Sequence, residues 1–154
     1  MAEYKDIKGY KIQVTNTDPI VYAGAWATGG TMNTARQYTG SFGSQTAGLV
    51  AGGETSTAVN SVEQYDGSSW TEIAEINTAR YGLEGFGNTS TSGFVTGGAP
   101  SALTESWNGT AWTEVADLPA ATERGGCAGT STSAFYVGGY SYGVSPNAAV
   151  NTGY

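Results

Sequence analysis

The sequence contains no histidine, a single cysteine and few charged residues of either sign. Histidine is the commonest general base and the commonest neutral metal ligand, so its absence removes the usual centre of a catalytic triad or a copper site. With Cys127 as the sole cysteine, no disulfide can form within the chain. We therefore predict no catalytic residue, no metal ligand, no cofactor and no enzymatic activity.

Basic residues are also scarce, and the formal net charge is −7. Nucleic-acid binding requires a basic patch that neutralises phosphates, so it is not expected here. No apolar run approaches the roughly 20 residues that span a membrane, and the N-terminus lacks the apolar core of a signal peptide. All three lysines lie within residues 1–19, which we interpret as a leader or docking segment: Lys5, Lys8 and Lys11.

Glycine and aromatic residues are abundant instead, with 24 Gly, 10 Tyr and 4 Trp among 154 residues. This composition favours short strands joined by tight turns, and an all-β fold. The stretch "NTAR" occurs twice, and the arginines of the chain follow at equal intervals of 44: Arg36, Arg80 and Arg124. An interval in the low forties with several strands per unit is typical of propeller blades.

Other positions repeat in a fixed order with the arginines. Each unit has a small apolar strand that ends in a glycine doublet, then an aromatic residue, a turn and a tryptophan. The doublets are Gly52-Gly53, Gly97-Gly98 and Gly138-Gly139, and the aromatic positions are Tyr65 with Trp107, and Trp26 with Trp70 and Trp112. We interpret all of these as structural positions of the repeat.

Period-two reasoning predicts four antiparallel strands per unit. In the first unit they are expected near Gln37–Gly43, Ala47–Gly53, Asn60–Tyr65 and Trp70–Ala74, with "DGSS" as the last hairpin turn. The blade repeats cover residues 20–154, in units of about 32–75, 76–117 and 118–154 with a further strand over 20–30. Units of this kind must stack to bury their aromatic faces.

The doublet, the aromatic, the tryptophan and the arginine together resemble the kelch repeat, over roughly residues 20–154. The resemblance implies four-stranded blades of a β-propeller, which commonly serves as a binding scaffold. Two departures stand out: the interval from Tyr65 to Trp70 is shorter than in typical kelch units, and the third unit does not reach its tryptophan. The missing strand could come from "YAGAWAT" near the N-terminus.

About three blades are fewer than the roughly four to eight of known propellers. Two chains could pair to make a six-bladed ring, the blades could stay open and be covered by other proteins, or the chain could be part of a longer one. We favour a partial propeller completed by assembly, with the pair of chains as one form of it.

The chain is also similar to Gly/Thr/Ser-rich repeat proteins of marine bacteriophages, through its "MAEYKDIKGYKIQ" leader and "WATGGTMNTAR". That resemblance implies a structural role in a virion, such as a tail fibre or head appendage, and location in a virion or extracellular assembly. Partners would be further copies, other virion proteins, or a host-surface glycan or protein. Contact is expected through the loops that follow the doublets, with candidates Glu54, Thr55, Pro100, Tyr140 and Tyr142.

Two other functions remain open as alternatives. A cellular kelch adaptor would bind a protein partner through the same loops. A sialidase-like propeller would use three arginines on an acidic sugar, but arginines at one repeat position are more simply structural, with guanidinium groups that satisfy carbonyls between blades. Cys127 is interpreted as a small buried side chain rather than a reactive thiol.

Overall fold

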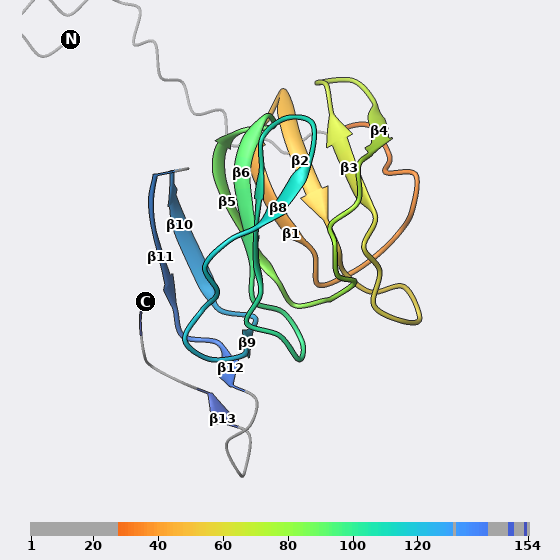
Figure 1. Cartoon of the computed structure of the whole chain (residues 1–154). Coiled ribbons are helices and arrows are strands. Elements are labelled where there is room, and N and C mark those ends of the chain that lie inside the picture. Colours follow the sequence, from red (N-terminus) through yellow and green to blue (C-terminus); the bar gives the residue numbers. More distant parts are fainter. Residues whose placement is uncertain (1–27, 131, 142–147, 150–152, 154) are drawn as a thin grey trace, which may run out of the picture.

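The computed structural model describes residues 28–130, 132–141, 148, 149 and 153, and within them the chain is all-β (Figure 1). No helix among these residues is long and apolar enough to cross a membrane. Trp26, Tyr142 and the leader lie outside the described residues.

Two four-stranded antiparallel sheets make up most of the described chain, and in each the strands are neighbours in sequence order. The first sheet consists of β1 (Gly40–Ser44), β2 (Ala47–Ala51), β3 (Val62–Tyr65) and β4 (Trp70–Ile73). The second sheet consists of β5 (Glu84–Thr89), β6 (Ser92–Thr96), β7 (Thr104–Trp107) and β8 (Trp112–Glu114).

A third group of shorter strands follows the second sheet. It consists of β9 (Thr122–Glu123), β10 (Gly126–Thr130), β11 (Ser133–Val137), β12 (Tyr140–Ser141) and β13 (Ala148–Ala149). Strands β10 and β11 form a hairpin, and β12 lies between β9 and β13. An isolated bridge joins Val137 to Gly153, in the place where Ala51 pairs with Val62 in the first sheet.

The predicted strands of the first unit are confirmed with small shifts at their ends. Strand β1 begins at Gly40 rather than at Gln37, because Gln37 forms an isolated bridge with Glu54 and Tyr38 has a positive φ of 56°. A non-glycine residue in that region interrupts an extended strand. The hairpin turn predicted at "DGSS" is confirmed between β3 and β4: Asp66 accepts hydrogen bonds of 2.8 Å from the N–H groups of Ser68 and Ser69.

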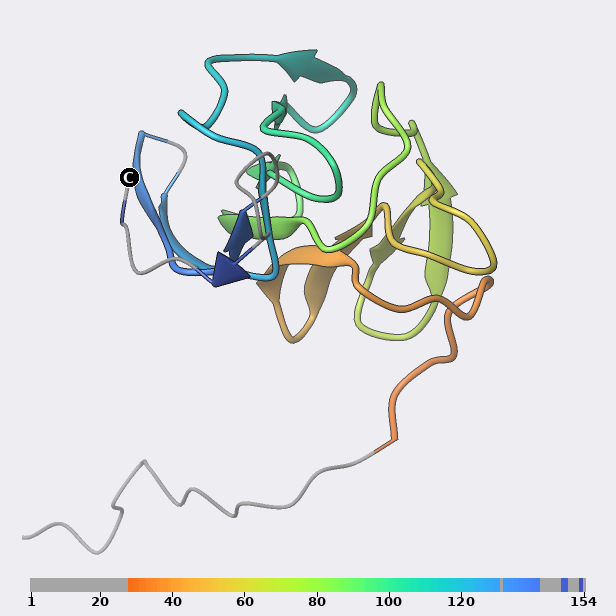
Figure 2. The same cartoon turned by 90° about the horizontal axis from the view of Figure 1, so that it is seen from below.

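The first strands of the three units lie next to one another, since β1 contacts β5 and β5 contacts β10. Viewed from below, the first sheet, the second sheet and the third group lie side by side in sequence order (Figure 2). The main hydrophobic core lies between the first two sheets and contains Phe42, Leu49, Ala51, Val62, Ile76, Leu83, Val95, Trp107 and Trp112. Phe42 fits there because Gly93 has no side chain; a Cβ on Gly93 would overlap the Phe42 ring.

The close approach of β1 and β5 gives a stability prediction at Gly85. A Cβ on Gly85 would lie 2.5 Å from the carbonyl oxygen and 2.6 Å from the nitrogen of Ser41, and backbone atoms cannot rotate away. We expect Gly85→Ala to lower the free energy of unfolding by about 1–3 kcal/mol in urea denaturation. Gly126→Ala is the control, because its Cβ would meet nothing closer than a Val137 carbon at 3.8 Å. Equal losses in the two variants would contradict this packing.

Candidate functional site

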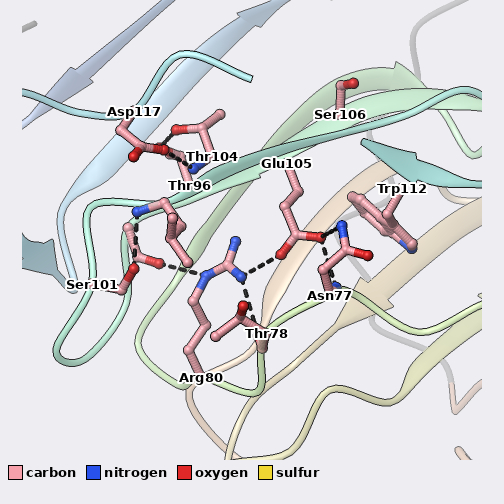
Figure 3. Close-up of polar contacts among 12 residues, drawn as sticks. Asn77, Thr78, Arg80, Thr96, Ser101, Thr104, Glu105, Ser106, Trp112 and Asp117 are labelled. Carbon is pink, nitrogen blue, oxygen red and sulfur yellow. Dashed lines mark hydrogen bonds and ion pairs between the residues drawn. The ribbon is translucent and has the colours of Figure 1, made fainter. Parts of the chain in front are cut away.

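A buried ion pair holds the second sheet to the segment that leads into it. Arg80 precedes β5, Glu105 lies on β7, and each side chain is only 1% exposed. The Nη1 of Arg80 lies 2.5 Å from Oε1 of Glu105, and its Nε donates to the carbonyl oxygen of Gly97 at 2.9 Å (Figure 3). Charge in this location is tolerated because both partners are paired and hydrogen-bonded.

The "NTAR" stretch supplies the rest of this arrangement. Asn77 donates to Oε2 of Glu105 twice, from its backbone N–H at 2.7 Å and from Nδ2 at 2.8 Å. The carbonyl oxygen of Thr78 accepts from Nη1 of Arg80 at 3.1 Å. We call the set of Asn77, Arg80 and Glu105 the second clamp, because Asn77 and Arg80 both bind the one carboxylate of Glu105.

The first sheet repeats the arrangement. Arg36 Nη1 lies 3.0 Å from Oε1 of Glu63, and the N–H of Asn33 donates to Oε2 of Glu63 at 2.7 Å. The Arg36 and Glu63 side chains are 0% and 2% exposed. We call Asn33, Arg36 and Glu63 the first clamp. The duplicated "NTAR" is therefore the same joint built twice around a glutamate on the third strand of a sheet.

Arg124 does not belong to this series, in contrast to the prediction from equal spacing. It has a positive φ of 55°, and its side chain is 51% exposed. The positions that share its conformation are Tyr38, with φ of 56°, and Gly82, with φ of 69°. A line of backbone hydrogen bonds joins the three, from Arg124 N–H to Gly82 O at 2.8 Å and from Gly82 N–H to Tyr38 O at 2.7 Å.

The repeat interval explains the difference. The strand glycines Gly43 and Gly87 are 44 positions apart, but Gly87 and Gly129 are only 42 apart. The second unit is shorter after its doublet: Gly53 precedes Glu63 by ten residues, whereas Gly98 precedes Glu105 by seven. The place of Arg36 and Arg80 is consequently taken in the third group by Thr122, which is fully buried.

These positions bear on the sialidase-like alternative. Arg36 and Arg80 each close on a glutamate of a different sheet, and the Arg124 guanidinium lies over the Tyr38 ring, 4.4 Å from its centroid. Arg36 and Arg80 are therefore buried and already paired with carboxylates, whereas a site for a carboxylate sugar needs guanidinium groups that can reach the ligand.

The glycine doublets adopt the conformation that makes glycine necessary. Both residues of all three doublets have positive φ, between 61° and 106°. The second residue also links neighbouring units, because Gly53 N–H donates to Arg80 O and Gly98 N–H donates to Thr122 O, each at 2.9 Å. Their role as structural repeat positions therefore rests on the backbone.

The predicted tryptophans pack against rings and donate to carbonyls. Trp112 is buried, meets the Phe42 ring edge-on at 6.3 Å between centroids, and donates from Nε1 to Ala74 O at 2.9 Å. Trp107 is buried beside Trp112, with ring centroids 5.1 Å apart. Trp70 packs against Tyr65 and donates to Gly30 O at 2.9 Å.

The loops after the first two doublets and strand β12, which follows the third, lie at one end of the sheets, at the bottom of Figure 1. Glu54 is half-buried and exchanges backbone hydrogen bonds with Gln37, whereas Thr55 and Pro100 are exposed. Tyr140 is 38% exposed and begins β12. This end, which we call the loop face, carries the described candidates for partner contact.

A group of titratable side chains lies between the second sheet and the β10–β11 hairpin. Burial raises the pKa of Glu84 to about 7. Burial, with a smaller effect from the charge of Glu84, raises the pKa of Cys127 to about 12, and its Sγ contacts Gly85 O at 3.2 Å. Burial likewise raises the pKa of Tyr136 to about 12. The unreactive role predicted for Cys127 agrees with a thiol that stays protonated at neutral pH.

The raised pKa of Glu84 predicts a pH-dependent stability. A carboxyl group whose pKa is higher in the folded chain favours folding below its unfolded pKa near 4.5, and this contribution is lost as the pH rises through about 7. Because Glu84 is only half-buried, solvent screening reduces the effect, and we expect a loss of only about 1 kcal/mol over that range. Urea denaturation at several pH values measures it, and Glu84→Gln is expected to remove the difference; an unchanged profile in that variant would contradict it.

Within the described part of the chain, no group of three or more Cys, Asp or Glu side chains could hold a metal ion. Models of known protein families do not match this chain, and a search of curated proteins finds no match either.

The glutamates of the clamps were not identified from the sequence. Glu63 and Glu105 stand in "SVEQY" and "LTESW", each one position after the residue that opens the third strand of its sheet. In both units an acidic residue stands at a buried strand position and an arginine precedes it in the sequence. This repeated combination is the signal that could have predicted the ion pairs.

Proposed function

We propose that this chain is a non-enzymatic structural protein of a virion or extracellular fibre, built from propeller blades that assemble with further copies or other structural proteins. Its loop face presents contacts for a host-surface glycan or protein. The observation that carries this proposal is the use of the buried charges. Arg36 and Arg80 each pair with a glutamate and hold one sheet to the segment that leads into it, while the loops after the first two doublets lie at one end of the sheets.

The arrangement of strands supports the propeller part of the proposal. Each full sheet has its strands in sequence order, and the first strands β1, β5 and β10 lie side by side. Blades of a propeller have this order, with the first strand nearest the axis. The doublet hydrogen bonds join each unit to its neighbour, as expected for stacked repeats.

The virion assignment is supported by the resemblance to phage repeat proteins in the leader and in "WATGGTMNTAR". Charge supports a partner other than nucleic acid, because the net charge is −7 and both buried arginines are already paired.

The test is to locate the protein in its source. Phage particles and fibres are purified by density-gradient centrifugation and their proteins identified by mass spectrometry. We expect this chain at a fixed copy number per particle. Recovery only from the soluble cell fraction, bound to a cellular protein, would favour the adaptor alternative, and release of acidic sugars from glycans by the purified chain would favour the sialidase-like alternative.

A second measurement tests the orientation of the loop face. A short epitope tag is inserted between Thr55 and Ser56 in one variant and between Gly67 and Ser68 in a control. The loop and the turn are both exposed but lie at opposite ends of the first sheet (Figure 1). Antibody labelling of intact particles is expected for the loop tag and not for the turn tag; the reverse would overturn the assignment of the contact face.

A further inference from the structure

We propose that Trp26 of a second copy of this chain fills the cavity between the second sheet and the β10–β11 hairpin, and so completes the third group of strands. The proposal rests on the proposed function, because it treats the third group as a blade that lacks its outer strand among the described residues.

The cavity has a volume of about 200 Å³. Its lining is mainly apolar and includes Phe86 and Leu118 from the second unit and Ala134, Phe135 and Tyr136 from the hairpin. A dry cavity of about 150 Å³ is enough to hold benzene, so this one has room for an aromatic ring.

The corresponding place between the first two sheets is filled by a tryptophan. There the Phe42 ring contacts Trp112, from the outer strand of the next sheet, with the ring planes at 76°. Phe86 occupies the place of Phe42 one unit later, and Ala134 the place of Gly93, as the strand pairing shows. The cavity thus lies where an equivalent of Trp112 would lie.

The surface next to the cavity is apolar and exposed. Phe135 is 56% and Val137 is 45% exposed, whereas Leu49 and Ala51, which hold the same places on β2, are 1% and 0% exposed. In the first two sheets, β3 pairs with β2 and β7 pairs with β6, on the side opposite the first strand. Along β11 the described residues show only the bridge from Val137 to Gly153. Leu49 and Ala51 are buried in the core between the first two sheets, so the exposed Phe135 and Val137 favour the packing of a further unit, such as one from a second copy, against the hairpin.

The hydrogen-bond pattern identifies Trp26 as the matching tryptophan. Trp112 donates its indole N–H to Ala74 O, four residues after Trp70. Trp70 donates to Gly30 O, which follows Trp26 by the same four residues. Trp26 therefore belongs to the same series, and the next carbonyl in it is that of Ala116, four residues after Trp112. An indole in the cavity is expected to donate to Ala116 O.

Trp26 must come from another molecule, because the Trp26 of the same chain cannot reach the cavity. The bond from Trp70 holds Gly30 on the side of the first sheet that faces away from the second sheet. Four extended residues span at most about 14 Å, whereas the first and second sheets, stacked at about 10 Å each, lie between Gly30 and the cavity. Two copies that each donate and receive one strand form a closed pair without free edges.

Native mass spectrometry and sedimentation of the full chain test the proposal. The chain of 15.8 kDa is expected to form a dimer, and Trp26→Ala to raise the dimer dissociation constant at least tenfold. Ala134→Trp, which blocks the cavity, is expected to do the same. A monomeric wild type, or a dimer that keeps its dissociation constant in Trp26→Ala, overturns the proposal.

A mixing experiment keeps the test independent of folding defects. In a dimer of either variant alone, no cavity is filled by Trp26. The open cavity of the Trp26→Ala chain can, however, receive Trp26 of the Ala134→Trp chain. The mixture is expected to form a mixed dimer in which one of the two cavities is filled by Trp26. Absence of that dimer between folded chains contradicts the proposal. If these variants leave the oligomer unchanged while the chain is still found in particles, the inference fails and the proposed function stands. If dimers depend on Trp26 but the chain is not found in particles, the inference stands and the proposed function fails.

Discussion

Replacement of Arg80 by methionine is expected to lower the free energy of unfolding by about 3–5 kcal/mol. Glu105 would stay buried and bonded to Asn77, but its charge would lose the guanidinium that compensates it. Urea denaturation followed by tryptophan fluorescence, at one protein concentration, measures the change.

Arg124→Met is the matched control for this substitution. The chemistry of the change is identical, but the Arg124 side chain is half-exposed and lies outside both clamps. We expect a change of less than about 1 kcal/mol. Similar losses at positions 80 and 124 would show that the spacing of 44, rather than the geometry of the clamp, describes the arginines.

A second replacement at Glu105 separates loss of the pair from loss of packing. In the double variant Arg80→Met with Glu105→Gln, no uncompensated charge remains and the Gln carbonyl can still accept from Asn77. We expect this variant to be more stable than Arg80→Met alone by at least about 1 kcal/mol. A double variant that is less stable would mean that the cost comes from the missing guanidinium contacts with Gly97 and Thr78.

Trp112→Ala is expected to cost about 3–5 kcal/mol, because it removes a large buried ring from between the first two sheets. The ring contacts Phe42 and Trp107, and its N–H ties the second sheet to Ala74. Thermal and urea unfolding both report the loss.

Trp70→Ala provides the comparison, because Trp70 holds the same place in the first sheet but is only half-buried. We expect a cost of about 1–2 kcal/mol there, in proportion to the smaller area removed from water. Costs of equal size would indicate that the outer face of the first sheet is covered in solution.

Much of the fold could be predicted because its signals are local. The doublet at Gly97-Gly98 and the turn at Gly67 are predicted from glycines, which adopt positive φ there, and period-two alternation places the strands between them. The clamp could not be read in this way. Glu105 pairs with an arginine 25 residues earlier, and only the folded sheet brings the two together.

The misplaced Arg124 shows a different limit. The shortened loop after Gly98 moves all later repeat positions toward the N-terminus. The residue equivalent to Arg80 is therefore Thr122, but Arg124 stands two residues later, at the position that an interval of 44 predicts. The interval between arginines cannot reveal a shorter loop when another arginine stands at the expected position. The carbonyl that accepts from the preceding glycine doublet does detect it, since that carbonyl belongs to Arg80 in one unit and to Thr122 in the next.

The hydrogen bonds that link Tyr38, Gly82 and Arg124 use main-chain atoms alone. Their side chains are a phenol, a single hydrogen and a guanidinium, yet the backbone takes the same left-handed turn at each. A joint of this kind leaves side-chain chemistry almost unconstrained. Units that differ in side chains and in loop length are therefore connected by the same backbone geometry, and the third group, which differs from the first two, is still joined to them in this way.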